Sequence, residues 1–264
     1  MSWKAIARSE TGTSHLSQGI PCQDYGGYRV FKDDVIVGAV ADGAGSAKYA
    51  DVGSELVVKR VLESFSEIDK YPDTPEELKP GFSQPLSKPE ANKLFEKIVK
   101  IVITELQNEA EKQGYLLNDL ACTLLVFVAT PHWLAAMQIG DGFIVLRPQK
   151  SEEYQLLFHP DKGEFANETT FITSENALQE MQVKVISGEQ EFICASTDGL
   201  EKVAIRLNDW TPFPPFFKPF EEYLQQTPNP EEDDKYVMDF LNYEKLNART
   251  DDDKTLLLCL WERE

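Results

Sequence analysis

The stretch VIVGAVADGAG, residues 35–45, places an aspartate directly after a run of apolar side chains. The run is short and rich in β-branched residues, so it predicts a buried strand from Val35 to Val40. Asp42 follows this strand, where a rigid backbone holds a carboxylate that can point into a cleft. Gly43 lets the chain turn and leaves its peptide carbonyl accessible. The stretch therefore predicts a core strand with a candidate functional group at its end.

The same pattern occurs three more times along the chain. Asp141 interrupts a hydrophobic stretch in IGDG, Asp198 follows the run FICA in STDG, and Asp252 precedes LLLCLW in DDDKT. A single Asp-Gly pair is explained by a turn. Several carboxylates that converge in a folded protein repel one another unless cations neutralise them. Hard divalent ions such as Mg²⁺ or Mn²⁺ prefer oxygen ligands, so this repeated pattern predicts a metal site.

Further short apolar runs predict additional strands, at residues 124–129, 133–146, 154–158, 191–196 and 255–261. Residues 129–132 form a tight link between two of these runs, which implies antiparallel pairing. Two longer stretches predict helices. One follows Ser46 and carries an apolar stripe from Val57 to Phe65. The other begins near Ser87 and ends at Gly114.

Two proline-containing stretches interrupt this pattern of strands and helices. Residues 71–88 contain four prolines and Gly81, so they predict a loop. Residues 208–234 combine aromatic side chains with prolines and predict an irregular segment, which either packs its aromatic rings on the core or forms a flap over a site. Both predicted helices need the same kind of sheet to cover, and no second core follows. We therefore expect residues 1–264 to form one domain.

The composition narrows the choice of partners and compartment. The chain has 264 residues, with 45 acidic and 26 basic side chains and a formal net charge of −19. Nucleic acid and anionic membrane surfaces are not expected as partners, because both attract clustered cations. No apolar run is long enough to span a bilayer, and the first residues lack the apolar core of a secretory signal. Four widely spaced cysteines without a CxxC motif are expected to be reduced thiols of a cytoplasmic protein.

Taken in order, several segments resemble the metal-dependent protein phosphatases of type 2C, particularly a divergent bacterial branch. The segments are GTSHLSQGIPCQD, VADGAGSA, ACTLLVFVA with QIGDG, ASTDGL and DDDKT. The resemblance extends from Gly12 to the C-terminal residue. It implies an α+β fold, a four-layer α-β-β-α sandwich in which two antiparallel sheets are flanked by helices. It also implies two divalent ions, Mg²⁺ or Mn²⁺, at one end of the sandwich, with a weaker third site.

The resemblance implies a role for each matched aspartate. Asp42 corresponds to the aspartate that bridges the two metals, and Gly43 to the glycine whose carbonyl binds one of them. Asp198 and Asp252 correspond to ligands of the second metal, which makes Asp42, Asp198 and Asp252 the expected catalytic centre. Asp141 matches an aspartate that helps to hold the weaker third metal.

Three further residues are expected close to the metals. Asp24 matches an aspartate of the family and is expected to have a structural or water-mediated role. Gln23 stands where the family shows glutamate, which removes one carboxylate near the second metal. Asp253 stands where the family usually has asparagine.

An arginine that many family members use and a histidine that some carry are both replaced here. Gly19 occupies the position of the arginine that grips the substrate phosphate, so His15, or Arg8 nearby, is expected to contact phosphate instead. A lone histidine is as often structural. Ala44 replaces a histidine that follows the first Asp-Gly pair in some members, so a general acid is absent from that position. A metal-bound water would then have to protonate the leaving group.

The resemblance implies hydrolysis of phosphoserine and phosphothreonine by a water that two metal ions activate. The expected partners are a phosphorylated protein substrate and a cognate serine/threonine kinase in bacterial signalling. Two alternatives remain open at this point. The first is a catalytically weak or inactive pseudophosphatase that binds phosphoproteins, which the missing arginine supports. The second is a structural or interaction protein whose Asp-Gly pairs are only turns and whose contact surface surrounds Phe216.

Overall fold

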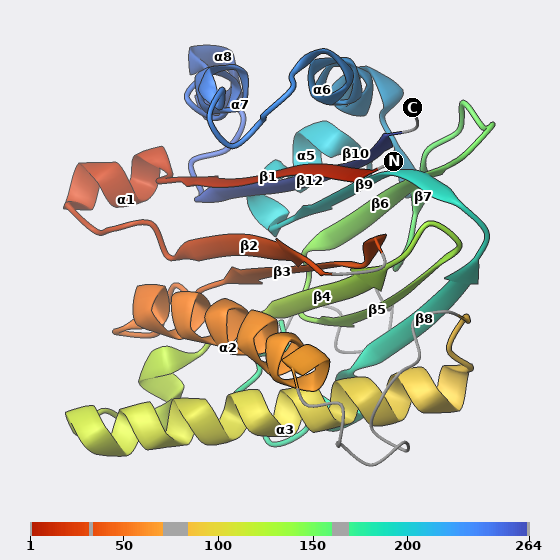
Figure 1. Cartoon of the computed structure of the whole chain (residues 1–264). Coiled ribbons are helices and arrows are strands. Elements are labelled where there is room, and N and C mark those ends of the chain that lie inside the picture. The colour runs from red at the N-terminus through yellow and green to blue at the C-terminus, as the bar shows by residue number, and fades with distance from the viewer. Residues whose placement is uncertain (1, 32–33, 71–83, 160–168, 263–264) are drawn as a thin grey trace.

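Two antiparallel sheets lie face to face, and helices cover the outer face of each (Figure 1). The computed structural model describes residues 2–31, 34–70, 84–159 and 169–262. The strands are β1 (Ser2–Glu10), β2 (Asp24–Val30), β3 (Ile36–Asp42), β4 (Leu124–Ala129), β5 (Trp133–Ile139), β6 (Phe143–Pro148), β7 (Gln155–Leu156), β8 (Gln182–Ser187), β9 (Gln190–Ser196), β10 (Ile205–Arg206), β11 (Thr211–Pro212) and β12 (Lys254–Glu262). The helices are α1 (Thr13–Gln18), α2 (Ala50–Lys70), α3 (Lys88–Gln113), α4 (Ala177–Glu180), α5 (Glu201–Ala204), α6 (Pro214–Gln226), α7 (Lys235–Leu241) and α8 (Glu244–Asn247), with short 3-10 turns η3 (Leu117–Leu120) and η4 (Asp198–Leu200).

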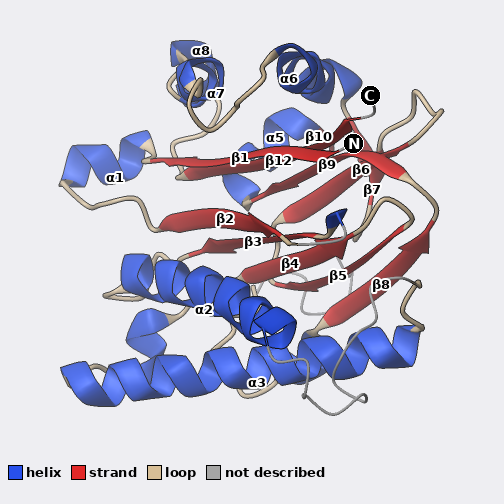
Figure 2. Ribbon diagram, viewed as in Figure 1, coloured by secondary structure: helices blue, strands red, loops and turns tan. Residues whose placement is uncertain are grey.

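The order of the strands defines two five-stranded sheets. The first sheet has the order β1-β12-β9-β6-β7, and the second has the order β2-β3-β4-β5-β8. Neighbouring strands run antiparallel in both sheets. α2 and α3 cover the second sheet, whereas α5 to α8 lie over the first (Figure 2). This arrangement confirms the predicted sandwich of two antiparallel sheets between layers of helices.

The central strands are covered on both faces, which explains their continuous apolar sequences. Every residue of β4 is buried. Val126 and Val128 pack in the cluster beneath α2 and α3, whereas Leu125 and Phe127 pack against the first sheet. Successive side chains of a strand point to opposite faces, so a strand buried between two layers needs apolar residues at every position. The strand predicted over 124–129 is therefore confirmed.

The long helix α3 begins and ends where the sequence predicts. The Ser87 hydroxyl accepts a hydrogen bond from the Glu90 N–H, and the Glu90 carboxylate accepts one from the Ser87 N–H, which together form a capping box. Gly114 ends the helix in the left-handed conformation, with φ of 74°. The other predicted helix, α2, begins at Ala50, four residues beyond the expected cap at Ser46. None of the helices in the described part of the chain is both long enough and apolar enough to cross a membrane.

Two predictions about the strands were incomplete. The apolar stretch 133–146 is two strands, β5 and β6, which belong to different sheets because the chain turns at Asp141 between them. The sequence reading also missed β1, β2 and β8, whose mixed polar and apolar residues do not form short apolar runs. Each of these three strands lies at an edge of its sheet.

The segment predicted to be irregular over 208–234 contains a helix, α6, from Pro214 to Gln226, and its aromatic rings pack on the core, as the first of the two alternatives expected. Pro214 and Pro215 open the helix, where the first N–H groups have no partner within the helix in any case. Phe217 and Phe220 are buried beneath it against the first sheet. Packing of these rings therefore offsets the interruption by Pro219. Of the loop predicted over 71–88, residues 71–83 lie outside the described part of the chain.

Candidate metal centre

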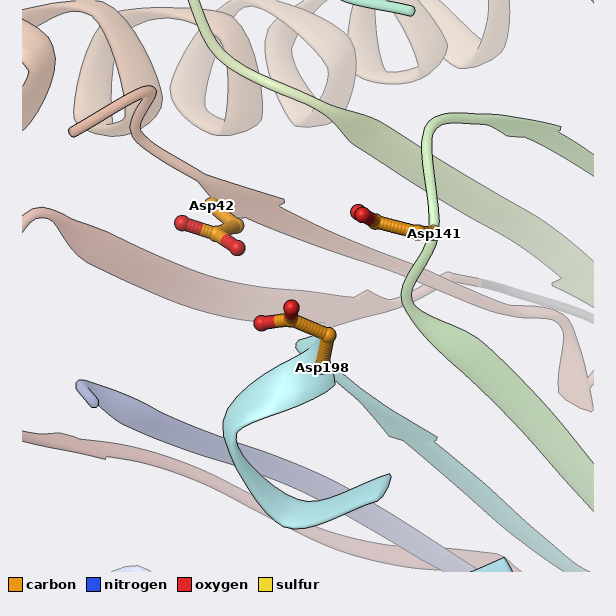
Figure 3. Close-up of side chains that lie close together, drawn as sticks. All are labelled: Asp42, Asp141 and Asp198. Atoms are coloured by element: carbon orange, nitrogen blue, oxygen red, sulfur yellow. The ribbon is translucent and has the colours of Figure 1, made fainter. Parts of the chain in front are cut away.

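Three aspartates from distant parts of the sequence meet at one end of the sandwich. Asp42 is the last residue of β3, Asp141 lies in the turn between β5 and β6, and Asp198 follows β9. One carboxylate oxygen from each residue lies within 4.8 Å of the other two. Figure 3 shows the three side chains pointing toward one another from separate elements. Because β3 belongs to the second sheet and β9 to the first, both sheets contribute to this cluster.

Asp24 takes part in hydrogen bonds that connect the two sheets beside the cluster. It pairs with Asp42 in the register of β2 and β3, and its carboxylate accepts a hydrogen bond of 2.6 Å from the Thr197 hydroxyl. The Thr197 oxygen in turn accepts the backbone N–H of Thr255 at 3.2 Å. This chain of contacts joins β2 of the second sheet to β9 and β12 of the first. It holds the residues next to Asp42 and Asp198 in fixed positions.

Burial and mutual repulsion raise the pKa values of Asp24, Asp42 and Asp198. Burial, together with the charges of Asp24 and Asp198, raises the pKa of Asp42 to about 11. Burial raises the pKa of Asp24 to about 8, and burial with the charge of Asp141 raises the pKa of Asp198 to about 6. A bound divalent cation would offset this repulsion. The donor set offers oxygen atoms only, from two half-buried carboxylates and the exposed Asp141, and it therefore fits Mg²⁺ or Mn²⁺.

Asp252 and Asp253 lie at the same end of the molecule, just before β12. Asp252 is not part of the group of three carboxylates, although its charge contributes to the raised pKa of Asp42. Asp253 is buried. Its two oxygens accept hydrogen bonds of 2.6 Å from the backbone N–H groups of Gly12 and Gln23. Asp253 thus joins the segments that precede α1 and β2 to the start of β12.

Two glycines allow the backbone of this segment to pack closely against its neighbours. A Cβ atom on Gly199 would lie 1.9 Å from the carbonyl oxygen of Asp253, and one on Gly12 would lie 2.3 Å from the carbonyl carbon of Asp252. Both distances are far shorter than van der Waals contact. Only glycine fits at these two positions, and the close packing places Asp198 and Asp252 beside each other.

Gly43 and Gln23 lie side by side where β2 and β3 begin and end. The Gly43 N–H donates to the backbone oxygen of Gln23 at 3.1 Å. A Cβ atom on Gly43 would lie 2.7 Å from the Cβ of Ala50, so the position is closely packed. The side chain of Gln23 is buried, and its Oε1 has no hydrogen-bond partner among the described residues.

The two candidate phosphate-binding residues lie in different surroundings. His15 in α1 places its Nδ1 3.0 Å from the carboxylate of Asp253, at the same end as the cluster. Arg8 instead forms ion pairs of 2.7 Å with Glu231 and with Asp234. In the described part of the chain, no hydrogen bond or ion pair joins Arg8 to the three clustered aspartates. The structure thus places His15 against Asp253, whereas Arg8 is held by two acidic residues that are not part of the cluster.

The sequence reading missed three polar residues around the cluster. Thr197 holds Asp24, as described above. The Thr169 hydroxyl donates a hydrogen bond of 2.5 Å to Asp141. Burial, with the charges of Asp198 and Asp141, raises the pKa of Glu201 to about 7. Thr197 and Glu201 lie within the STDGLE segment and could have been found there. Nothing in the sequence around Thr169 indicates its contact.

Comparisons with known proteins agree with this geometry. The family model described as Protein phosphatase 2C matches residues 11–241. Serine/threonine-protein phosphatase 3 of Escherichia coli (strain K12) is 32% identical over 267 residues, which covers 99% of each chain. The solved serine/threonine phosphatase of S. agalactiae has a TM-score of 0.64 at 15% identity and covers 98% of this chain and 100% of that one. RsbX in complex with magnesium has a TM-score of 0.56 at 13% identity and covers 98% of this chain and 96% of its own.

Two sheets flanked by helices and a cluster of carboxylates at one end, taken with the family model and the 32% identical relative, identify a metal-dependent protein phosphatase. The chain belongs to the protein phosphatase 2C family, because the family model spans most of its length and a full-length relative is 32% identical. The resemblance stated from the sequence is therefore confirmed. The solved structures, at 13% and 15% identity, support the fold alone.

Proposed function

We propose that this protein hydrolyses phosphoserine and phosphothreonine in protein substrates, with Mg²⁺ or Mn²⁺ held by Asp42, Asp141 and Asp198. The observation that carries the proposal is the convergence of these three carboxylates, one oxygen of each within 4.8 Å of the others. Bound divalent ions would supply an activated water and neutralise charge on the phosphoryl oxygens. Gly43, through its carbonyl, and Asp252 complete the proposed set of ligands.

The protein's own residues prepare the site for a doubly negative phosphate. The net charge of −19 would repel such a substrate, but cations bound among the clustered aspartates reverse the local field. Asp24 and Asp253 hold the backbone around the cluster through contacts to Thr197, Gly12 and Gln23. Groups that are held rigidly need no reorganisation when charge develops on the substrate, which favours catalysis.

Apart from the missing arginine at Gly19, no observation within the described residues favours the inactive pseudophosphatase. Asp42 and Asp198 are both present and meet at one point. Burial, with the charges of neighbouring aspartates, raises the pKa of both groups, which is typical of functional carboxylates. Similarly, three aspartates that served only as turn residues would not need to converge.

The charge of the chain and its cysteines bear on the substrate and the compartment of the protein. The acidic surface favours protein substrates with basic residues near the phosphorylated side chain, and a serine/threonine kinase would supply the phosphate. A cytoplasmic location is supported by the four cysteines, all of which are free thiols in the structure.

The proposed activity is tested by turnover of the purified protein. We expect hydrolysis of p-nitrophenyl phosphate and of a phosphothreonine peptide in the presence of Mn²⁺ or Mg²⁺, and loss of both activities when a chelator is added. Restoring activity with excess metal controls for irreversible damage by the chelator. If calorimetry shows that the protein binds both metals and yet neither supports turnover, the proposal is contradicted. That result would favour the pseudophosphatase that only binds phosphoproteins.

A further inference from the structure

His15 and Asp253 form an oriented pair. His15 Nδ1 lies 3.0 Å from Asp253 Oδ2, although the two residues are 238 positions apart in the sequence. Asp253 also accepts hydrogen bonds from two backbone N–H groups, so its carboxylate is the acceptor and Nδ1 is the donor. The contact fixes the orientation of the imidazole ring. It leaves Nε2 as the nitrogen that can serve another group.

The pair lies at the end of the sandwich that carries the acidic cluster. Asp253 directly follows Asp252, and the backbone of Asp252 packs against Gly12 at the start of the His15 segment. Burial raises the pKa of Asp252, and the nearby charge of His15 offsets part of this shift. Figure 1 shows α1, which carries His15, where the chain crosses from β1 in one sheet to β2 in the other. The His15 side chain is partly accessible to solvent, at 18%.

Hydrolysis of a phosphoserine or phosphothreonine has a specific chemical requirement. The bond that breaks releases the side-chain oxygen, and an alkoxide is a poor leaving group unless a proton reaches it as the bond breaks. A positioned acid that supplies this proton typically contributes about 10²–10⁴-fold to the rate. Ala44 carries no group that could do so. A histidine whose other nitrogen is held by a carboxylate has the arrangement that this role requires.

We propose that His15, positioned by Asp253, donates a proton from Nε2 to the leaving oxygen of the phosphorylated side chain. The inference rests on the proposed function and adds a catalytic residue to it. The proton comes from the imidazolium form of His15, which carries a proton on both nitrogens. As water adds to phosphorus, the bond between phosphorus and the side-chain oxygen breaks, and the Nε2 proton moves to that oxygen to form a hydroxyl group. The neutral imidazole then takes up the proton that the attacking water releases, so the products are phosphate and the free side chain.

Substrates with different leaving groups distinguish a residue that donates a proton from a residue that only binds phosphate. Nitrophenolate is stable as an anion near neutral pH, so hydrolysis of p-nitrophenyl phosphate needs little help from an acid. Hydrolysis of a phosphothreonine peptide releases an alkoxide, which needs a proton from an acid as it leaves. A residue that only binds phosphate would contribute equally to both reactions, because the phosphoryl group is the same in the two substrates.

The test compares both substrates in His15→Gln and His15→Asn, with Mn²⁺ present. Asn places its amide near the position of Nδ1 and can still donate to Asp253, but it lacks an Nε2 equivalent. We expect kcat to fall by about 100-fold or more on the phosphothreonine peptide in both variants, and much less on p-nitrophenyl phosphate. Calorimetric Mn²⁺ affinity and the thermal midpoint should stay close to those of the wild type.

His132→Gln is the matched control, because His132 is a largely exposed histidine on the turn between β4 and β5. It should retain wild-type kcat on both substrates. Equal losses on both substrates in the His15 variants would overturn the inference and assign phosphate binding to His15. Unchanged kcat on both would also overturn it. If the wild type hydrolyses neither substrate, the proposed function itself fails, which is a separate result.

Discussion

Asp42→Asn is expected to lower metal-dependent kcat/KM by about 10³-fold or more while the protein stays folded. The substitution removes the charge of a carboxylate that lies within 4.8 Å of Asp141 and Asp198, but it keeps the size of the side chain. Stabilisation of transition-state charge by bound metal is worth several kcal/mol, and about 4 kcal/mol corresponds to a factor of 10³. Turnover of p-nitrophenyl phosphate with Mn²⁺ measures this loss, and calorimetry should show weaker Mn²⁺ binding. Asp239→Asn, which removes an exposed carboxylate from α7, is the control for net charge.

The same variant is expected to be more stable than the wild type when a chelator is present. The pKa of Asp42 is raised to about 11, so the folded state holds a proton that the unfolded state releases above its ordinary pKa of 3.8. Stability therefore falls as pH rises between these values, and Asn removes this dependence. The thermal midpoint of Asp42→Asn should exceed that of the wild type at pH 8 by more than it does at pH 5.5. Full activity, or a midpoint below the wild type at pH 8, would contradict this role for Asp42.

Gly199→Ala is expected to damage both the fold and the activity. The added Cβ would lie 1.9 Å from the carbonyl oxygen of Asp253, so the segments that carry Asp198 and Asp252 must move apart. Overpacking of this kind costs about 1–3 kcal/mol or more. In a chain of this size, each kcal/mol lowers the thermal midpoint by roughly 2–4 °C. We expect a midpoint about 5–10 °C below the wild type and at least a tenfold loss of kcat with Mn²⁺, measured by thermal unfolding and turnover.

Gly45→Ala is the matched control for this substitution. Gly45 lies in the first Asp-Gly segment, yet a Cβ atom there would meet nothing within 4 Å. Its effect should stay within about 0.5 kcal/mol. If Gly199→Ala unfolds at the same temperature as Gly45→Ala, the close packing of the two acidic segments is not what holds them in place.

The parts of the fold that could be predicted are those that both layers cover. β3 and β4 read as continuous apolar runs because one face meets helices and the other meets the opposite sheet. β1, β2 and β8 were missed because edge strands carry polar and exposed residues that hide the apolar pattern. α6 was missed for a different reason. Its prolines suggested a loop, whereas burial of Phe217 and Phe220 stabilises a helix there.

The residues of the site that could be predicted are those that lie in a local sequence motif. Asp42, Asp141 and Asp198 each stand next to a strand end and a glycine, and the structure brings all three together. The hydrogen bond of Thr169 to Asp141 and the pairing of His15 with Asp253 depend on segments that only the folded chain places side by side. No local pattern can indicate such contacts.

The metal centre is tested most directly by diffraction from crystals grown with saturating Mn²⁺. An anomalous difference map locates manganese without assumptions about the reaction. We expect at least one strong peak between the carboxylates of Asp42, Asp141 and Asp198, with metal–oxygen distances of about 2.0–2.6 Å. A map with no anomalous peak at these carboxylates would contradict the account.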